Sequence, residues 1–195
     1  MDKKTQKAYS VNALEYSRGW LAQPQPQDVY SLLKKFFIPD GITADIGCGN
    51  GRDSNWMSLN GFNVTGYDSN QDLLKLASQL YSHIRFEQAF LPSLKQIKEQ
   101  FDNVFCETVI MHLPRSELVE GVQGLKSILK DKGSLYLSWR VTEGEDMRHK
   151  DGRLYSSFES SLILDQFPKS SVLHFEDKIS ESSGKRVCRL ISKSV

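Results

Sequence analysis

Residues 45–53 read Asp45-Ile46-Gly47-Cys48-Gly49-Asn50-Gly51-Arg52-Asp53, and this stretch decides the fold. It follows the short apolar run 42–46, which has the character of a strand, and leads into residues 53–60, which have that of a helix closed by Gly61. A strand, a glycine-rich turn and a helix in this order are typical of the first unit of an open parallel sheet. Ligands of such sheets bind beyond the carboxyl ends of the strands, so we expect a binding site at this turn.

Strand-like and helix-like segments alternate around this turn. Further strands are predicted at 63–67, 84–88, 103–108 and 134–140, and further helices at 27–37, 70–81, 94–99, 116–130 and 157–165. The alternating runs 171–180 and 185–192 flank a Ser/Gly turn and predict an antiparallel hairpin at one sheet edge. The pattern therefore predicts an α/β fold of the Rossmann-like, doubly wound type, with a mostly parallel seven-stranded sheet, a C-terminal antiparallel β-hairpin and helices on both faces.

The N-terminal segment is set apart by a compositional break, Gln23-Pro24-Gln25-Pro26-Gln27. A polar helix is predicted before it, at about residues 3–18. We therefore expect residues 1–26 to form a helical lid over one domain that comprises residues 27–195.

The composition is that of a soluble globular protein and argues against several functional classes. The 195 residues carry 25 Lys and Arg against 24 Asp and Glu, a formal net charge of +1, whereas dedicated nucleic-acid binders are strongly basic. No run of 18 apolar residues and no signal-peptide pattern is present, so we expect no membrane association and a cytoplasmic location. The widely spaced Cys48, Cys106 and Cys188 favour reduced thiols, and we expect no metal site.

The spacing of the glycine turn distinguishes between nucleotide ligands. The turn reads G-x-G-x-G after Asp45, whereas the NAD-type turn reads G-x-G-x-x-G and receives a pyrophosphate, for which the Asp45 carboxylate is an unfavourable neighbour. A ligand with an ammonium beside a carboxylate fits better, because Asp45 attracts the cation, directly or through water, and the turn amides receive the anion. Asp68 ends the next predicted strand, 17 residues after Gly51, where a carboxylate can accept hydrogen bonds from both hydroxyls of a ribose.

Several segments carry a family resemblance: Ala44-Asp45-Ile46-Gly47-Cys48-Gly49-Asn50-Gly51-Arg52, the acidic strand end at Asp68, Phe86-Glu87-Gln88-Ala89-Phe90-Leu91-Pro92, Phe101-Asp102-Asn103-Val104-Phe105-Cys106-Glu107, and Leu125 to Leu137. Over residues 28–193 the chain resembles the class I S-adenosylmethionine-dependent methyltransferases. The segments 50–53, 62–67 and 111–113 are most similar to the small-molecule branch, which includes tellurite- and thiopurine-type methyltransferases. The resemblance implies an enzyme that moves a methyl group from S-adenosylmethionine to an oxygen or nitrogen nucleophile of a small molecule by in-line displacement, with S-adenosylhomocysteine as product.

The resemblance also implies a role for each residue of the cofactor site. The methionine part would lie against Gly47, Gly49 and Gly51, with Cys48, Asn50 and Arg52 in the same site and Asp45 near its ammonium. Asp68 would hold the ribose hydroxyls, with Ser69 beside the adenosine. Gln88 and Ala89 match the end of the third strand near adenine, where the family often has an acidic residue in place of Gln88.

The predicted lid contains three aromatic residues, Tyr9, Tyr16 and Trp20. Their spacing can place two of them on one helix face, where Tyr16 in particular would contact the cofactor. The alternative is that the three rings only pack the helix onto the domain.

Two residues near the end of the fourth predicted strand are candidates for catalysis. Glu107 is expected to face both cofactor and acceptor, or else to cap a helix. His112 lies between apolar residues before Pro114, and its imidazole is either a general base or a hydrogen-bonded structural group. Cys106 is expected to be a core residue, since no proline precedes it, and the Asn-Pro-Pro-aromatic motif of amino-nucleobase methyltransferases is absent.

Two groups of basic residues lie outside these motifs. The first group comprises Arg140, Arg148 and Arg153. These arginines either clamp an acidic acceptor or belong to a solvated loop of mixed charge. The acidic residues between them favour the solvated loop. The other, which alternation explains as the exposed face of a strand, comprises Lys185, Arg186, Arg189 and Lys193.

Two alternative functions remain open at this point. One is a nucleotide-dependent oxidoreductase on the same fold, which Asp45 and the glycine spacing disfavour. The other is a non-catalytic protein that binds S-adenosylmethionine or S-adenosylhomocysteine and presents residues 1–26 to a partner, which Glu107 together with His112 disfavours.

Overall fold

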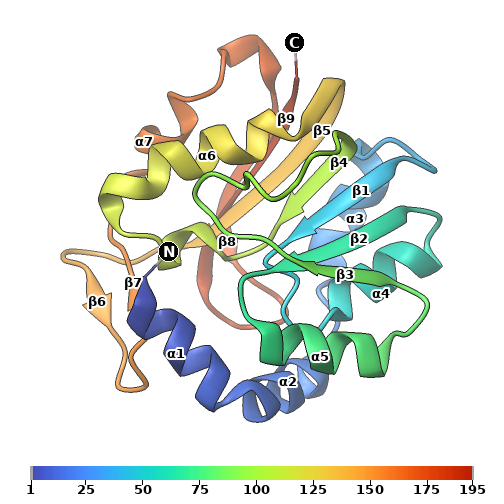
Figure 1. The fold of residues 1–195 in the computed structure, drawn as a ribbon. Coiled ribbons are helices and arrows are strands. Elements are labelled where there is room, and N and C mark those ends of the chain that lie inside the picture. The colour runs from blue at the N-terminus through green and yellow to red at the C-terminus, as the bar shows by residue number, and fades with distance from the viewer. Residues whose placement is uncertain (1, 195) are drawn as a thin grey trace.

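The computed structural model describes residues 2–194, and its centre is a seven-stranded sheet in the order β3-β2-β1-β4-β5-β9-β8 (Figure 1). The strands are β1 Ile42–Ile46, β2 Asn63–Asp68, β3 Arg85–Gln88, β4 Phe101–Cys106, β5 Leu129–Arg140, β8 Val172–Ile179 and β9 Arg186–Lys193. The strands from β1 to β5 are parallel, and β9 runs antiparallel to both β5 and β8. The sheet confirms the predicted fold, including the hairpin at its edge.

Helices cover both faces of this sheet, as predicted. They are α3 Gln27–Phe36, α4 Arg52–Leu59, α5 Gln71–Leu80, α6 Leu118–Ser127 and α7 Ser160–Leu164. Alternation along β5 explains the two layers, because Tyr136 packs with α3 and α4, whereas Leu135 and Leu137 pack with α6 and α7. Helix α5 packs along β3 and β2, and the side chain of Asn70 caps its first turn by accepting hydrogen bonds from Asp72 N–H and Leu73 N–H.

The first strand, β1, pairs with β2 on one side and β4 on the other, so the chain changes direction across the sheet at this point. Connections after β1 and after β4 therefore diverge and leave a crevice at the carboxyl ends of these strands.

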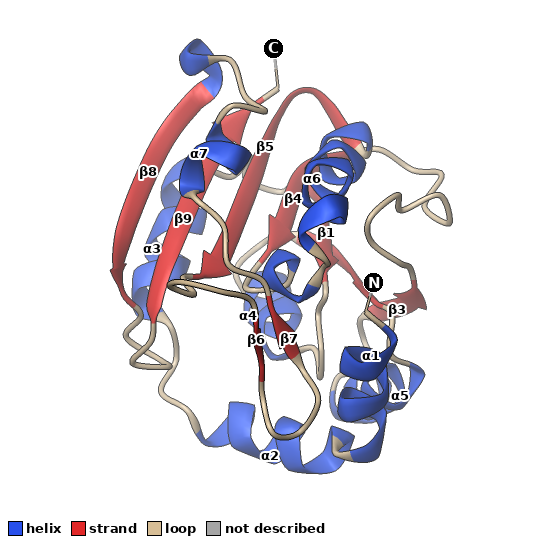
Figure 2. Ribbon diagram, turned by 90° about the vertical axis from the view of Figure 1, so that its left-hand side faces the viewer, coloured by secondary structure: helices blue, strands red, loops and turns tan. Residues whose placement is uncertain are grey.

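Two further helices, α1 Lys3–Val11 and α2 Ala13–Ala22, lie across these carboxyl ends, beside the small hairpin of β6 Met147–Arg148 and β7 Leu154–Tyr155 (Figure 2). Leu154 N–H donates to Thr5 Oγ1 at 2.9 Å, and Arg148 pairs with Asp2 at 2.9 Å. The N-terminal segment and a loop some 150 residues later therefore form one cover over the crevice.

The structure corrects some of the predicted elements. Residues 94–99 form turns and not a helix, because Leu94 has a left-handed backbone (φ +48°) that buries its side chain in the core. The predicted helix 3–18 is two helices, broken at Asn12, and the predicted loop 141–153 contains β6. Strand β5 begins at Leu129, within the predicted helix 116–130, which ends as α6 at Ser127.

Cys48, Cys106 and Cys188 are buried and free, as predicted. Between residues 2 and 194, no helix combines the length and the apolar character needed to cross a membrane.

Candidate functional site

A cavity of about 410 Å³ lies at the carboxyl ends of the parallel strands. Its floor consists of the turn 47–50 after β1 and the segment 107–109 after β4. Tyr9 and Trp20 line it from α1 and α2, and residues of the turn 180–185 between β8 and β9 line it from the other side. The cavity is therefore at the place where open α/β sheets bind ligands.

The glycine turn is packed between two elements of the site. The amides of Gly47 and the next residue donate to the carbonyl oxygen of Tyr67, at 2.7 and 3.0 Å. Gly47 has a φ of +78°, and a Cβ there would lie 2.3 Å from Val109. Gly49 has a φ of +56°, and its Cβ would lie 3.0 Å from the ring of Trp20. Glycine is needed at both positions, because α2 and the segment after β4 approach the turn backbone directly.

Asp68 faces this cavity from the end of β2. Its Oδ2 accepts a hydrogen bond from Gly49 N–H (2.9 Å), and its Oδ1 accepts one from Asn70 N–H (2.8 Å). Burial raises the pKa of this carboxyl group, although the amides act in the opposite direction. Each oxygen keeps a second acceptor position, so the side chain can receive the two hydroxyls of a ribose.

Asp45 lies beneath the glycine turn and does not line the cavity. Its side chain is buried, and its Oδ2 accepts a hydrogen bond from Ser54 Oγ at 2.5 Å. Burial raises the pKa of Asp45 to about 8. Any effect of this carboxyl group on a bound cation therefore acts through the turn.

The other turn residues connect the turn to α2. Asn50 Nδ2 donates to the carbonyl oxygen and the hydroxyl of Ser17, at 3.2 and 3.0 Å. Arg52 donates to the carbonyl oxygen of Trp20 (3.1 Å) and pairs with Asp53 (3.0 Å). Asn50 and Arg52 line the cavity, as does Cys48, whereas Gly51 begins α4 outside it.

The residues expected near adenosine separate into two groups. Ser69 and Ala89 line the cavity, together with Leu73 and Leu91, which leave an apolar surface for a flat base. Gln88 lies outside the cavity, where its amide donates to the carbonyl oxygen of Ser69 at 2.9 Å.

Tyr16 does not line the cavity either. Its hydroxyl donates to Asp151 at 2.8 Å, and its ring stacks on Trp20. Of the aromatic residues in the predicted lid, Tyr9 and Trp20 face the cavity, while Tyr16 supports them from behind.

Glu107 lines the cavity just after β4. Tyr136 Oη and Ser138 Oγ both donate to its Oε2, each at 2.5 Å. Burial raises the pKa of this carboxyl group. Since both donors are on Oε2, the other oxygen is available to a ligand.

His112 also lines the cavity, and its ring is held on both sides. Nδ1 lies 2.5 Å from the carbonyl oxygen of Leu154, and Nε2 lies 3.0 Å from Tyr9 Oη. Burial lowers the pKa of His112 to about 4, and the guanidinium of Arg153 adds to this effect. The imidazole is therefore neutral near pH 7.

The expectation that the arginines at and beside the loop 141–153 are solvated is wrong for Arg140, at the end of β5, and for Arg153. Arg140 and Arg153 both line the cavity and lie over the ring of Tyr155, at 5.0 and 5.6 Å from its centroid. Arg148 remains at the surface in its ion pair with Asp2. Sequence spacing gave no signal for Tyr155 and left Arg140 open between an acceptor clamp and a solvated loop, because hydrogen bonds distant in sequence fold the loop over the cavity.

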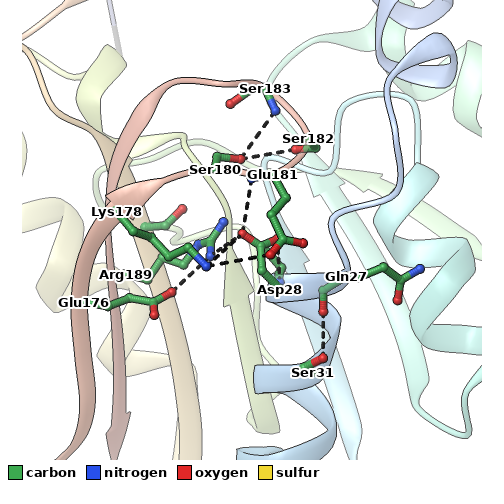
Figure 3. A network of polar contacts seen from close by, with 12 residues as sticks. Gln27, Asp28, Ser31, Glu176, Lys178, Ser180, Glu181, Ser182, Ser183 and Arg189 are labelled. Carbon is green, nitrogen blue, oxygen red and sulfur yellow. Dashed lines mark hydrogen bonds and ion pairs between the residues drawn. The ribbon is translucent and has the colours of Figure 1, made fainter.

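The prediction that Arg189 lies on the exposed face of β9 is wrong, because this residue is fully buried. Strand β9 lies inside the sheet, so Arg189 faces α3, where it pairs with Asp28 (2.8 Å) and with Glu176 of β8 (3.0 Å). Figure 3 shows these contacts at the start of α3, below the serine turn that begins at Ser180. Asp28 also accepts a hydrogen bond from Glu181 N–H at 3.3 Å and thereby fixes the turn that borders the cavity.

Across residues 2–194, no group of three or more His, Cys, Asp or Glu side chains is arranged to hold a metal ion. The cavity offers carboxylates, hydroxyls, guanidinium groups and aromatic rings, which is a donor set for an organic ligand.

Comparison with known proteins gives results that agree with this geometry. Residues 44–133 match a family model described as a methyltransferase domain. The tRNA U34 carboxymethyltransferase of Campylobacter hominis is 33% identical over 123 residues, which cover 60% of this chain and 42% of that protein. The chain spans about half the length of the curated relatives it matches.

Solved structures share the fold over nearly the whole chain. A SAM-dependent methyltransferase from Anabaena variabilis has a TM-score of 0.76 at 18% identity, covering 100% of this chain and 96% of that one. The 1,6-didemethyltoxoflavin-N1-methyltransferase of Burkholderia thailandensis, solved with bound 1,6-didemethyltoxoflavin and S-adenosylhomocysteine, has a TM-score of 0.75 at 14% identity, covering 98% of this chain and 88% of that one. The match over residues 44–133 and the curated methyltransferase relatives indicate a methyltransferase domain, and the glycine turn and the strand order agree with this.

Proposed function

We propose that the protein transfers a methyl group from S-adenosylmethionine to an oxygen or nitrogen atom of a small molecule. The observation that carries the proposal is the position of Asp68, the glycine turn and Glu107 around one cavity. The cover formed by α1, α2 and the β6–β7 hairpin favours a small acceptor, because a macromolecule would have to displace it. The Burkholderia neighbour, whose substrate is a small molecule, supports the same class.

The cofactor would occupy the side of the cavity near β1 and β2. Asp68 would accept hydrogen bonds from the ribose hydroxyls, and the apolar side chains of Leu73, Ala89 and Leu91 would surround the adenine, next to Ser69. The turn residues 47–50 and Arg52 would receive the methionine part, with Asp45 stabilising its ammonium from below the turn. Gln88 and Tyr16 would support this site through Ser69 and Trp20.

Bound S-adenosylmethionine supplies a methyl group on a sulfonium, which is already a good leaving group. The chain's own contribution is therefore to align the acceptor with the methyl group, to exclude water and to remove a proton from acceptors that carry one. Trp20 on the glycine turn and Tyr9 beside His112 close the cavity for the first two purposes.

Glu107 is the better of the two candidate bases. Its raised pKa makes it a stronger base than an ordinary carboxylate, and the two hydroxyl donors are both on Oε2 and leave Oε1 for a ligand. His112, with a pKa near 4, is a weak base whose two ring nitrogens are already engaged. We therefore propose that Glu107 removes the proton and that His112 holds Tyr9 in position.

The first test is calorimetric titration with S-adenosylhomocysteine, with NAD as the control ligand. We expect a micromolar Kd for the former, about −8 kcal/mol, and no binding of NAD. Binding of NAD alone would overturn the proposal in favour of an oxidoreductase. A non-catalytic binding protein would bind S-adenosylhomocysteine but would not form it from S-adenosylmethionine with any member of a broad acceptor library.

A further inference from the structure

The cavity extends beyond Glu107 to the end of β5 and the turn between β8 and β9. This lobe contains two cationic side chains, Arg140 and Lys185, that have no ion pair anywhere in the described chain, residues 2–194. Arg140 is half-buried, so its unpaired charge is partly removed from water. An unpaired guanidinium in a cavity wall is unusual, because its five N–H donors require acceptors.

The other charged groups around the cavity are already compensated. Arg52 pairs with Asp53 at 3.0 Å, and Arg153 pairs with Asp151 at 3.0 Å. The Glu107 carboxylate has two hydroxyl donors on Oε2. Asp68 lies at the opposite end of the cavity, where two backbone amides face its oxygens. Arg140 and Lys185 together carry two positive charges, and the Glu107 carboxylate offsets one of them. The lobe therefore has an excess of about one positive charge.

The guanidinium of Arg140 is also held in place. It lies 5.0 Å from the ring centroid of Tyr155. The attraction between a cation and the face of an aromatic ring stabilises this position and orients the guanidinium plane. The neighbouring residue across the sheet, Val187, lines the cavity as well. Arg140 thus offers a preorganised, planar set of donors, which matches the two oxygens of a carboxylate.

The turn that completes this lobe is built from serines. Ser180, Ser182 and Ser183 line the cavity, and Ser180 Oγ lies 3.3 Å from Ser182 Oγ. Because Asp28 accepts a hydrogen bond from the adjacent Glu181 N–H, the turn is held in a fixed position above the start of α3 (Figure 3). Its hydroxyls can donate to an anion that Arg140 has drawn into the lobe.

We propose that the methyl acceptor is a small organic acid whose carboxylate binds to Arg140 and Lys185 beside the serine turn. This placement directs the opposite end of the acceptor, with its nucleophilic oxygen or nitrogen, toward Glu107. The excess of about one positive charge selects a monoanion over a dianion such as a phosphate ester. The inference rests on the proposed function, since it assigns the acceptor class to the same cavity.

The test uses the full chain loaded with S-adenosylhomocysteine and ligand-observed NMR. The probes are hydroxybenzoates, aminobenzoates and short hydroxy acids, each paired with its uncharged carboxamide. We expect acids to bind and their amides to bind at least about tenfold more weakly. In Arg140→Met the affinity for the bound acids should fall by about tenfold, while Arg140→Lys retains part of it and the Kd of S-adenosylhomocysteine is unchanged.

Arg115→Met is the matched control, because Arg115 is exposed and lies outside the cavity. It should bind acids as the unmodified protein does. The inference is overturned if no acid binds, if amides bind as tightly as acids, or if Arg140→Met keeps full affinity for the acids. The proposed function is tested separately, by calorimetric titration with S-adenosylhomocysteine. If the unmodified protein does not bind this ligand, the proposed function is overturned.

Discussion

The hydroxyl oxygen of Tyr9 lies 3.0 Å from Nε2 of His112 and joins the first helix to the segment after β4. On the other side of the ring, Nδ1 lies 2.5 Å from the carbonyl oxygen of Leu154, a group that can only accept. Nδ1 therefore carries the hydrogen, and Nε2 of the neutral ring accepts a hydrogen bond from Tyr9. This pair of contacts fixes both the tautomer of His112 and the position of the cover.

The first prediction concerns the titration of His112. Burial lowers its pKa to about 4, so the folded state binds the proton less tightly than the unfolded state. We expect ¹⁵N NMR to show the neutral Nδ1–H form throughout pH 5.5–8. The contribution of His112 to stability should be constant above its usual pKa of 6.5 and should be lost as the pH falls from there toward 4. A midpoint near 6.5 for this ring would contradict its burial.

The second prediction concerns Asp68→Asn. The substitution removes one acceptor oxygen and the negative charge, so the affinity for S-adenosylhomocysteine should fall by about 1–3 kcal/mol. Calorimetry measures this change directly. Asp72→Asn is the control, because Asp72 is 48% exposed and lies outside the cavity. Equal affinities for both variants would refute the role of Asp68.

The core of the fold could be predicted from local sequence signals. Strands such as 42–46 and 63–67 are short apolar runs that lie between helices with one apolar face, and the glycine turn between them has a narrow set of allowed conformations. The predicted helix 94–99 failed because a short apolar spacing does not reveal that Leu94 adopts a left-handed backbone. Gly124 of α6 packs against the carbonyl oxygen of Pro92, a contact that only the folded chain supplies.

The candidate site could be predicted more completely on the cofactor side than on the acceptor side. Asp68 and the glycine turn lie at strand ends, where their position follows from the order of the elements. Arg140, Tyr155 and Ser180 meet in the acceptor lobe through contacts between segments that are distant in sequence, such as the one between Leu154 and Thr5. The burial of Arg189 likewise depends on β9 being an inner strand of the sheet, which alternation along one strand does not reveal.

The third prediction concerns Glu107→Gln. The variant keeps an oxygen for Tyr136 and Ser138 but cannot take up a proton, so kcat should fall by about 10²–10⁴-fold for an acceptor that must lose one. Because the pKa of Glu107 is raised, the rate of the unmodified enzyme should increase with pH as this group loses its proton. Glu120→Gln, an exposed substitution on α6, should leave the rate and this pH profile unchanged. A full rate in Glu107→Gln would assign proton removal to another group.

The fourth prediction concerns Asp45→Asn. The pKa of Asp45 is raised to about 8 in the folded state, so ionisation of this group destabilises the fold as the pH rises from about 4 to 8. The amide can still accept the hydrogen bond from Ser54. At pH 8 and without cofactor, the free energy of unfolding should therefore increase by at least about 1.4 kcal/mol, the equivalent of one pKa unit. Urea unfolding at pH 6 and pH 8 measures this change, and a variant that is less stable at pH 8 would contradict it.

The same substitution should weaken binding of S-adenosylhomocysteine. Asp45 stabilises the cofactor ammonium in its ionised form, and the uncharged amide that replaces the carboxylate would not. An increase in apo stability together with a loss of affinity would separate an electrostatic role for Asp45 from a purely structural one. Loss of both would indicate that the carboxyl group only supports the turn.

The last prediction concerns Arg189→Met, which removes the buried cation between α3 and the β8–β9 hairpin. Asp28 is only 5% exposed, so its carboxylate would be left buried without its main partner. We expect a loss of about 3–5 kcal/mol in the free energy of unfolding, measured with urea at pH 7. Arg186→Met is the matched control, since Arg186 pairs with Asp177 and Glu143 at the surface and should cost at most about 1 kcal/mol.

The pH dependence of this effect has a definite sign. Arg189 holds the pKa of Asp28 below its usual value, although burial opposes it, so the pair stabilises the fold above pH 4 and its contribution is lost as the pH falls further. The difference between the unmodified protein and Arg189→Met should therefore shrink in acid. In the double variant with Asp28→Asn, the loss should be smaller than the sum of the two single losses, because the buried charge is gone. Additive losses would show that Asp28 and Arg189 do not act as a pair, and the serine turn would then depend on other contacts for its position.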